Sequence, residues 1–234
     1  MSDQQLVAEE SVGERTGLLG GTFDPVHYAH LAIAEEVYAA LKLTRVLFVP
    51  AGQPPHKQGD AITPVQQRLA MLELAIAGNT HFEISLVDVQ RAGPSYTVDT
   101  LRLLRQEWGP RAEFSFIIGG DSLEDLPDWY KPAEILAQAT LVALMRPGYA
   151  EISSERRARL EARLPALKHR LISLEGPRMD ISSTELRQRV AEGRPIRYQV
   201  PDAVEEYILR EGLYRNNNQG HWPEQDYMHV TNGF

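Results

Sequence analysis

Apolar residues alternate along this chain between short continuous runs and stretches with helical spacing. The short runs predict buried strands. They lie at residues 17–19, 45–50, 82–87, 113–121, 140–145 and 171–174. Apolar residues that recur every three or four positions predict amphipathic helices between these runs. Predicted helices lie at residues 31–41, 65–76 and 98–108, in a short segment after 130, and at 151–163, from 181, and at 201–211.

The regular alternation of strands and helices predicts the fold class. It is typical of an α/β, Rossmann-like doubly wound fold, with a mostly parallel sheet and helices on both faces. In such folds ligands bind at the carboxyl ends of the strands. Residues 1–15 lack this pattern and predict a flexible N-terminal arm, and the polar residues 216–234 predict a C-terminal tail. A single domain is therefore expected over residues 16–215.

The stretch Gly20–His30 has the composition of a polyphosphate-binding loop. Its two leading glycines let the backbone turn tightly and approach a ligand closely. Asp24 is predicted to be a helix N-cap with Pro25 at the first helical position, so that free N–H groups would face a phosphate. His27 and His30 are three residues apart and are expected to project from one face of this helix.

Two further helix starts carry capping signals. Residues 63–66 predict a capping box with Pro64 at the first helical position, and Ser182 with Glu185 predicts another. Arg187 follows the second start by about one turn. A guanidinium group at that place can bind a phosphate with two hydrogen bonds.

Composition narrows the classes of protein that remain. In 234 residues, 43% are apolar and 24% charged, as in an ordinary globular α/β domain. The formal net charge of −8 disfavours a nucleic-acid surface but is compatible with a local basic pocket. The chain has no cysteine, which excludes disulfides and thiolate metal sites. No apolar run reaches membrane-helix length, and the acidic N-terminus resembles no secretion signal, so a cytoplasmic protein is expected.

Several motifs in order carry a family resemblance. GGTFDPVHYAH and ISSTELR resemble the two signatures of the nucleotidylyltransferase superfamily. Between them, PPHK, GPSYTVDTL, GGDSLEDLPDWY and RPGY are similar to successive loops of the bacterial nicotinate-mononucleotide adenylyltransferases. Ala29 stands where the family has a glycine, and its methyl group is expected to have modest effects.

The resemblance implies that ATP and nicotinate mononucleotide react to give a dinucleotide and pyrophosphate. The substrate phosphate is itself the nucleophile, so the protein must orient an in-line attack and stabilise charge. The implied catalytic residues are His27, His30, Lys57 and Arg187. The implied ATP-binding residues are Gly20, Gly21, Thr22, Phe23, Asp121, Arg146, Ile181, Ser182, Ser183 and Thr184. The implied pyridine-nucleotide residues are Ser95, Tyr96, Thr97, Trp129 and Tyr130. No protein metal site is expected, and Mg²⁺ would arrive bound to ATP.

Other interpretations remain open. Without the resemblance, Lys57 would be an exposed lysine, Asp121 a turn residue, and Trp129 with Tyr130 core aromatics. Another superfamily enzyme, such as a phosphopantetheine adenylyltransferase or a cytidylyltransferase, would share the two signatures. A non-catalytic nucleotide sensor should have lost a phosphate-handling residue, and an aminoacyl-tRNA synthetase fragment would need RNA contacts that the acidity disfavours. The expected partners are small molecules, without nucleic acid or membrane, and homo-oligomerisation is left open.

Overall fold

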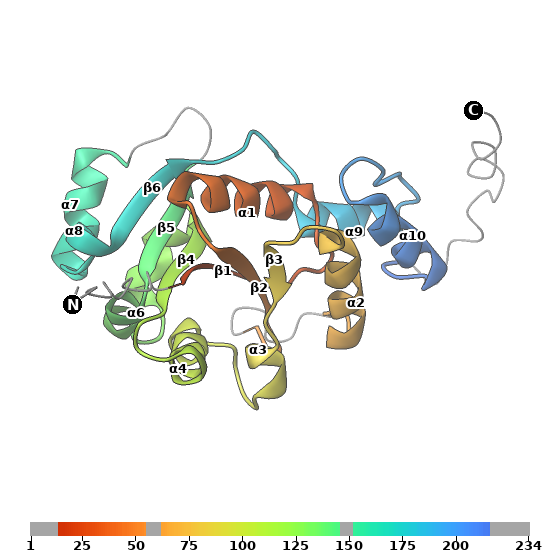
Figure 1. The fold of residues 1–234 in the computed structure, drawn as a ribbon. Coiled ribbons are helices and arrows are strands. Elements are labelled where there is room, and N and C mark those ends of the chain that lie inside the picture. Colours follow the sequence, from red (N-terminus) through yellow and green to blue (C-terminus); the bar gives the residue numbers. More distant parts are fainter. Residues whose placement is uncertain (1–13, 55–61, 146–151, 216–234) are drawn as a thin grey trace, which may run out of the picture. The chain divides into compact units, whose positions relative to one another are not determined.

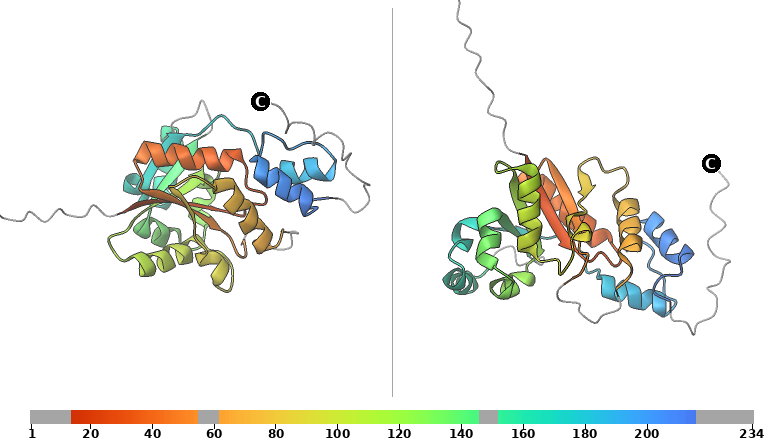
Figure 2. Two further views of the ribbon diagram at one scale, coloured as in Figure 1. Left: turned by 45° about the vertical axis from the view of Figure 1, so that its right-hand side comes forward. Right: turned by 90° about the horizontal axis from the view of Figure 1, so that it is seen from below.

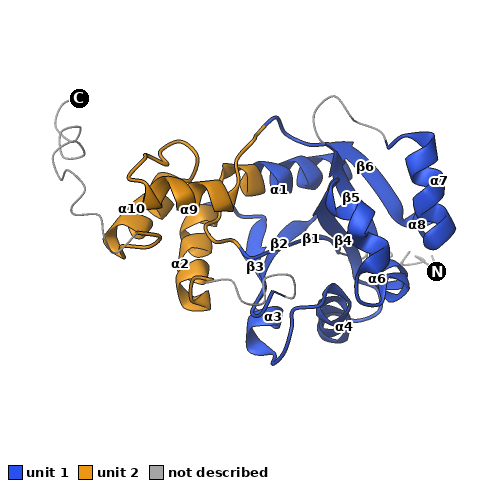
Figure 3. Cartoon of the chain, turned by 180° about the vertical axis from the view of Figure 1, so that it is seen from behind, with its two compact units in different colours: residues 1–22, 32–60, 78–178 blue, residues 23–31, 61–77, 179–234 orange. Residues whose placement is uncertain are grey.

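The computed structural model describes residues 14–54, 62–145 and 152–215. Two compact units divide the chain: unit 1 comprises residues 1–22, 32–60 and 78–178, and unit 2 comprises residues 23–31, 61–77 and 179–234 (Figure 3). Except for Glu14 and Arg15, the predicted arm lies outside the described residues, and so does the predicted tail. Within the described part, no helix is long and apolar enough to cross a membrane.

Unit 1 contains a six-stranded sheet in the order β3-β2-β1-β4-β5-β6 (Figure 1). All neighbouring strands are parallel. The strands are β1 (Arg15–Gly21), β2 (Arg45–Pro50), β3 (Phe82–Ile84), β4 (Glu113–Gly119), β5 (Thr140–Met145) and β6 (Leu171–Glu175). The order reverses between β1 and β4, the place where doubly wound folds bind ligands. The predicted fold class is confirmed.

Helices cover both faces of this sheet (Figure 1, Figure 2). α1 (Tyr28–Leu41) lies on one face, and α4 (Thr97–Trp108) and α6 (Pro132–Gln138) lie on the other. Burial on two faces explains why the strands appear in the sequence as continuous apolar runs. Of the apolar stripe Val98, Leu101, Leu104 and Trp108 expected on helix α4, the first three are buried and Trp108 is partly buried.

The remaining elements of unit 1 are short. They are α3 (Val87–Gln90), α5 (Ser122–Asp125), the 3₁₀ helix η2 (Leu126–Asp128), α7 (Ser154–Arg163) and α8 (Leu167–Arg170). The strand predicted over residues 82–87 is too long, because β3 ends at Ile84. The Ser85 hydroxyl then accepts a hydrogen bond from the Val87 N–H at 3.5 Å, where α3 begins.

Unit 2 is helical. Its complete helices are α2 (Val65–Ile76), α9 (Ser183–Ala191) and α10 (Asp202–Arg210), and α2 packs against α10. Their buried apolar residues are Met71, Leu72, Leu186, Val190, Val204 and Ile208. The helix predicted over residues 201–211 is confirmed as α10, and Gly212, two residues after its end, has a φ of 64° that favours glycine.

Two predicted helix caps are wrong. Helix α1 begins at Tyr28, so neither Asp24 nor Pro25 occupies its cap. Helix α2 has Pro64 at its N-cap, without a side-chain hydrogen bond from Thr63. Both polar residues are engaged elsewhere in unit 2, as described below. The third predicted cap is confirmed, because the Ser182 hydroxyl accepts the Glu185 N–H at 3.2 Å.

Candidate active site

Among the described residues of unit 1, the predicted ATP residues Gly20, Gly21, Thr22 and Asp121 lie at or just after the carboxyl ends of β1 and β4, the switch point of the sheet. β1 and β4 are paired in parallel, so the loop that follows Gly21 and the loop that follows Gly119 leave the same edge. Asp121 is exposed on the second of these loops. A Cβ atom at Gly120 would lie 2.9 Å from the Met145 sulfur, which explains the glycine there. The loop is held by Arg156, whose guanidinium donates to the Gly120 carbonyl at 3.0 Å.

The predicted pyridine-nucleotide residues also belong to unit 1. The Ser95 hydroxyl accepts hydrogen bonds from the N–H groups of Gly52 at 3.0 Å and Gln53 at 3.3 Å. It therefore fixes the loop that follows β2. Thr97 is the first residue of α4. Nothing in the sequence indicated this structural role of the Ser95 hydroxyl, because Ser95 and Gly52 are 43 residues apart.

The aromatic residues of this group differ in their surroundings. The rings of Tyr96 and Tyr130 lie 4.7 Å apart, and Tyr130 is 49% exposed. Trp129 is partly buried and meets the Phe116 ring edge-on at 6.3 Å. Tyr130 is therefore open to a ligand, whereas Trp129 also has the core-packing role that a buried aromatic residue would have.

Unit 2 brings the two predicted histidines together. His27 immediately precedes α1 and His30 lies in its first turn. Their rings are stacked, with centroids 3.7 Å apart and planes at 23°. The His27 main-chain N–H donates to Nδ1 of His30 at 3.3 Å, and Phe23 meets the His30 ring edge-on at 5.1 Å. The two rings lie together as predicted, but His27 precedes α1, so they do not share a face of the helix.

The burial of these rings determines their charge. His27 is 4% exposed, and burial lowers its pKa to about 4. The pKa of His30 is also well below its usual value, first because of burial and then because of repulsion by a charged His27. Both imidazoles are therefore neutral at pH 7. Nδ1 of His27 is buried and has no hydrogen-bond partner among the described residues, so it can bond to a ligand or a water molecule.

Helix α9 joins the histidine loop within unit 2. The Ser183 hydroxyl donates to the Pro25 carbonyl at 2.9 Å. Nη1 of Arg187 donates to the Asp24 carbonyl at 2.8 Å, and Nη2 lies 3.4 Å from the Thr184 hydroxyl. The two sequence signatures are thus bonded to each other by contacts between residues that are 158 and 163 positions apart in the sequence.

The side chain of Asp24 is the centre of a buried network that the sequence did not predict. It is 2% exposed, and its carboxylate accepts the Tyr214 hydroxyl at 2.7 Å and the Thr63 N–H at 3.2 Å. Arg68, which is 1% exposed, donates from Nε to the Thr63 carbonyl at 2.9 Å. Burial lowers the pKa of Arg68, and the charge of Asp24 opposes this shift. The sequence did contain one signal for the buried position of Arg68, because this basic residue lies on the apolar face of α2.

The other predicted residues can be placed more briefly. Lys57 and Arg146 lie outside the described residues. Ile181 is partly buried just before α9, Ser182 and Thr184 are exposed, and the side chain of Ala29 is buried. No cluster of three or more potential metal ligands occurs among the described residues.

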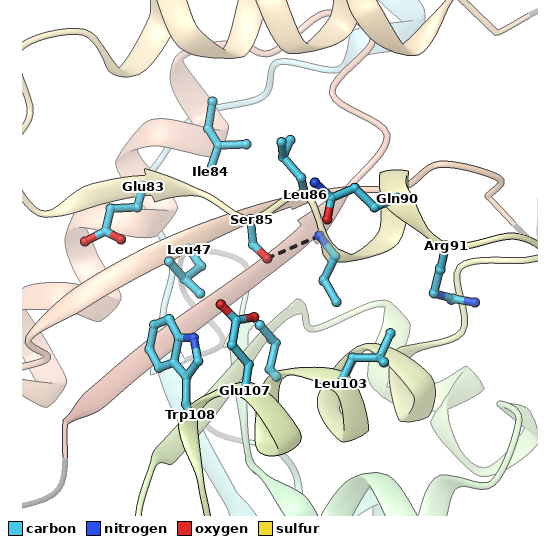
Figure 4. Close-up of a pocket in the computed structure, with 12 residues that line it drawn as sticks. Leu47, Glu83, Ile84, Ser85, Leu86, Gln90, Arg91, Leu103, Glu107 and Trp108 are labelled. Atoms are coloured by element: carbon cyan, nitrogen blue, oxygen red, sulfur yellow. Dashed lines mark hydrogen bonds between the residues drawn. The ribbon is translucent and has the colours of Figure 1, made fainter.

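Unit 1 also has a hollow of about 540 Å³ between β3, α3 and α4 (Figure 4). Figure 4 shows Trp108 and Glu107 on one side of it, facing Leu47 and Ser85. A second hollow, of about 960 Å³, lies near the amino ends of β1, β4 and β5. None of the predicted site residues lines either hollow, so these hollows are separate from the predicted site.

Comparisons with known proteins agree with these features. The model of the cytidylyltransferase-like family matches residues 18–189. The chain is 54% identical to a Thermomicrobium roseum protein over 86% of this chain and 92% of that protein. It is also 54% identical to a protein of Roseiflexus sp. over 85% of this chain and 97% of the relative. Both relatives are named "Probable nicotinate-nucleotide adenylyltransferase".

Solved structures support the fold. Plasmodium falciparum nicotinic acid mononucleotide adenylyltransferase complexed with APC matches with a TM-score of 0.66 and 19% identity. The same protein complexed with NaAD matches with a TM-score of 0.68 and 18% identity. Each match covers 86% of this chain and 97% of the other. From the family model and the two close relatives, the chain belongs to the family of nicotinate-nucleotide adenylyltransferases.

Proposed function

We propose that this enzyme transfers the adenylyl group of ATP to nicotinate mononucleotide, giving deamido-NAD and pyrophosphate in NAD biosynthesis. The observation that carries the proposal is the arrangement in unit 2, where two stacked neutral histidines follow a loop whose Asp24 carbonyl is bonded to Arg187 of α9. The relatives' names support the pyridine-nucleotide substrate. The exposed Tyr130 beside Tyr96 in unit 1 offers an aromatic surface suited to a pyridine ring.

The reaction needs no covalent enzyme intermediate. A phosphate oxygen of the mononucleotide forms a bond to the α-phosphorus, and the bond from that phosphorus to the bridging oxygen breaks. The electron pair leaves with pyrophosphate, whose growing negative charge requires compensation. We assign this role to His27, His30, Lys57 and Arg187. Neutral imidazoles donate hydrogen bonds from N–H, whereas the guanidinium supplies a full positive charge.

The remaining predicted residues divide between the two substrates. We assign residues 20–23, Asp121, Arg146 and residues 181–184 to ATP, and residues 95–97 with Trp129 and Tyr130 to the mononucleotide. Mg²⁺ is proposed to enter with the ATP phosphates, since this ion usually keeps few protein ligands. The catalytic domain is proposed to span residues 16–215. We propose a cytoplasmic location because ATP is held inside the cell.

The decisive experiment measures pyrophosphate release from ATP with three acceptors side by side. These are nicotinate mononucleotide, nicotinamide mononucleotide and phosphopantetheine. We expect release with nicotinate mononucleotide, and His30→Ala should reduce kcat by about 10²–10³-fold with little change in ATP affinity. Pyrophosphate release at the background rate with every acceptor would refute the proposed enzymatic activity. A preference for phosphopantetheine would refute the assignment of nicotinate mononucleotide as the substrate.

A further inference from the structure

We propose that Tyr214 is a positioning residue for adenylyl transfer, acting through Asp24 on Arg187 and the histidine loop. The inference rests on the proposed function, but it concerns a residue, Tyr214, that no motif includes. Tyr214 is near the end of the described chain, and its hydroxyl donates to the Asp24 carboxylate 190 positions earlier at 2.7 Å. Asp24 lies inside the loop that carries both histidines. The C-terminal segment is thereby fastened to the predicted phosphate-handling loop.

The hydrogen bond between Tyr214 and Asp24 persists over a wide pH range and is shielded from water. Burial raises the pKa of Tyr214, and the negative charge of Asp24 raises it further. The phenol therefore remains a donor throughout the pH range in which enzymes work. Asp24 is 2% exposed, so water cannot easily replace a donor that is removed. Tyr214 and the Thr63 N–H each bind a different oxygen of this carboxylate.

Asp24 transmits this restraint through its own backbone. Its carboxylate is held by Tyr214, while its main-chain carbonyl accepts Nη1 of Arg187 at 2.8 Å. A shift of Asp24 would therefore move the carbonyl that orients the guanidinium. It would also move the peptide that leads to His27, three residues further on. A misplacement of about 1 Å can reduce a rate about 10²-fold when catalysis depends on orientation.

The variant Tyr214→Phe removes only the hydroxyl. The matched control is Tyr207→Phe on α10, since the Tyr207 hydroxyl has no hydrogen bond to a described residue and its ring lies 5.1 Å from the Arg210 guanidinium. We expect Tyr214→Phe to lower kcat about 10- to 100-fold and to weaken ATP binding about 3- to 10-fold. The KM for nicotinate mononucleotide should stay within about twofold, and the control should behave like the parent.

A double-mutant cycle with Arg187→Ala separates positioning from general stability. If Tyr214 acts through Arg187, adding Tyr214→Phe to Arg187→Ala should change kcat less than about twofold. An unchanged kcat in Tyr214→Phe, or the same fold-loss in both backgrounds, would overturn the proposal. Thermal unfolding of each variant checks that it is folded at the assay temperature. If Tyr214→Phe does not fold, Asp24→Asn replaces it in the same cycle, because it keeps the carbonyl and removes the charge.

Calorimetric ATP binding keeps this proposal distinct from the proposed function. A parent protein that binds ATP but makes no dinucleotide would refute adenylyl transfer. The role of Tyr214 would then be decided by the same cycle on the ATP dissociation constant. If Tyr214→Phe weakens ATP binding only in the protein that keeps Arg187, the positioning role is supported. Equal weakening with and without Arg187→Ala overturns that role.

Discussion

Acid should destabilise this protein through its stacked histidines. In the folded protein, burial lowers the pKa of His27 from 6.5 to about 4. The unfolded chain therefore binds a proton at a pH where the folded protein does not. The stabilisation that comes from the neutral ring is present above pH 6.5 and is lost as the pH falls toward 4. His30 contributes in the same direction, since its pKa is also lowered.

The size of the effect follows from the shift of His27. Each pKa unit corresponds to about 1.4 kcal/mol, so the full shift amounts to about 3 kcal/mol once the pH is below 4. Between pH 7 and pH 5 the loss should be about 2 kcal/mol from His27 alone. This loss is a substantial part of the free energy of unfolding of a typical domain, which is about 5–15 kcal/mol.

Urea unfolding at pH 7, 6 and 5 measures this loss. The parent should lose free energy of unfolding over this range, and His27→Gln should lose about 2 kcal/mol less, because glutamine does not titrate. His169→Gln on α8 is the matched control, since it removes an exposed histidine and leaves the stacked pair intact. Equal pH dependence in the parent and in His27→Gln would refute the reasoning. So would a His27 ring that titrates near pH 6.5 by NMR.

Four further outcomes follow from contacts in unit 1. Gly120→Ala should lower the free energy of unfolding by about 1–3 kcal/mol in urea titrations, because the new methyl group would lie 2.9 Å from the Met145 sulfur. Arg156→Met should raise the KM for ATP, since the Gly120 carbonyl loses its donor; an unchanged KM would exclude this support role. Tyr130→Ala should raise the KM for nicotinate mononucleotide without lowering stability much, because the ring is 49% exposed. Trp129→Ala should lower both the stability of the protein and its affinity for nicotinate mononucleotide. An unchanged midpoint of thermal unfolding would contradict the packing role of Trp129.

The elements of the sheet could be predicted because burial determines their sequence. Strands covered on both faces need apolar residues at most positions, and this pattern leaves few alternatives. The shortened β3 shows the limit of that signal. Residues 85–87 continue the mixed apolar pattern, but the Ser85 hydroxyl binds the backbone locally and α3 begins at Val87. Periodicity does not report such local competition.

The helix caps show a different limit. Asp24 before a proline and Thr63 before a proline have the same local appearance as true caps. In the folded chain both belong to the network of Tyr214 and Arg68, which are distant in the sequence from Asp24. Capping preferences consider only the residues next to a helix end, whereas these two residues have donors and acceptors from distant parts of the sequence around them. The signatures are local patterns that can be recognised in the sequence, whereas the distant residues that bond to them, such as Tyr214, carry no local signal.

Charge balance in unit 2 explains how a chain of net charge −8 can offer a place to an anion. Within the network, the carboxylate of Asp24 lies among Thr63, Arg68 and Tyr214, and Arg187 is bonded to the Asp24 carbonyl. The histidines add no charge at pH 7, because burial keeps them neutral. Two guanidinium groups against one carboxylate leave a local positive surplus, and the neutral rings add hydrogen-bonding groups without repelling Arg187. Nearby buried charges act more strongly than distant surface charges screened by salt, so a local positive surplus can attract a triphosphate despite the negative net charge of the chain.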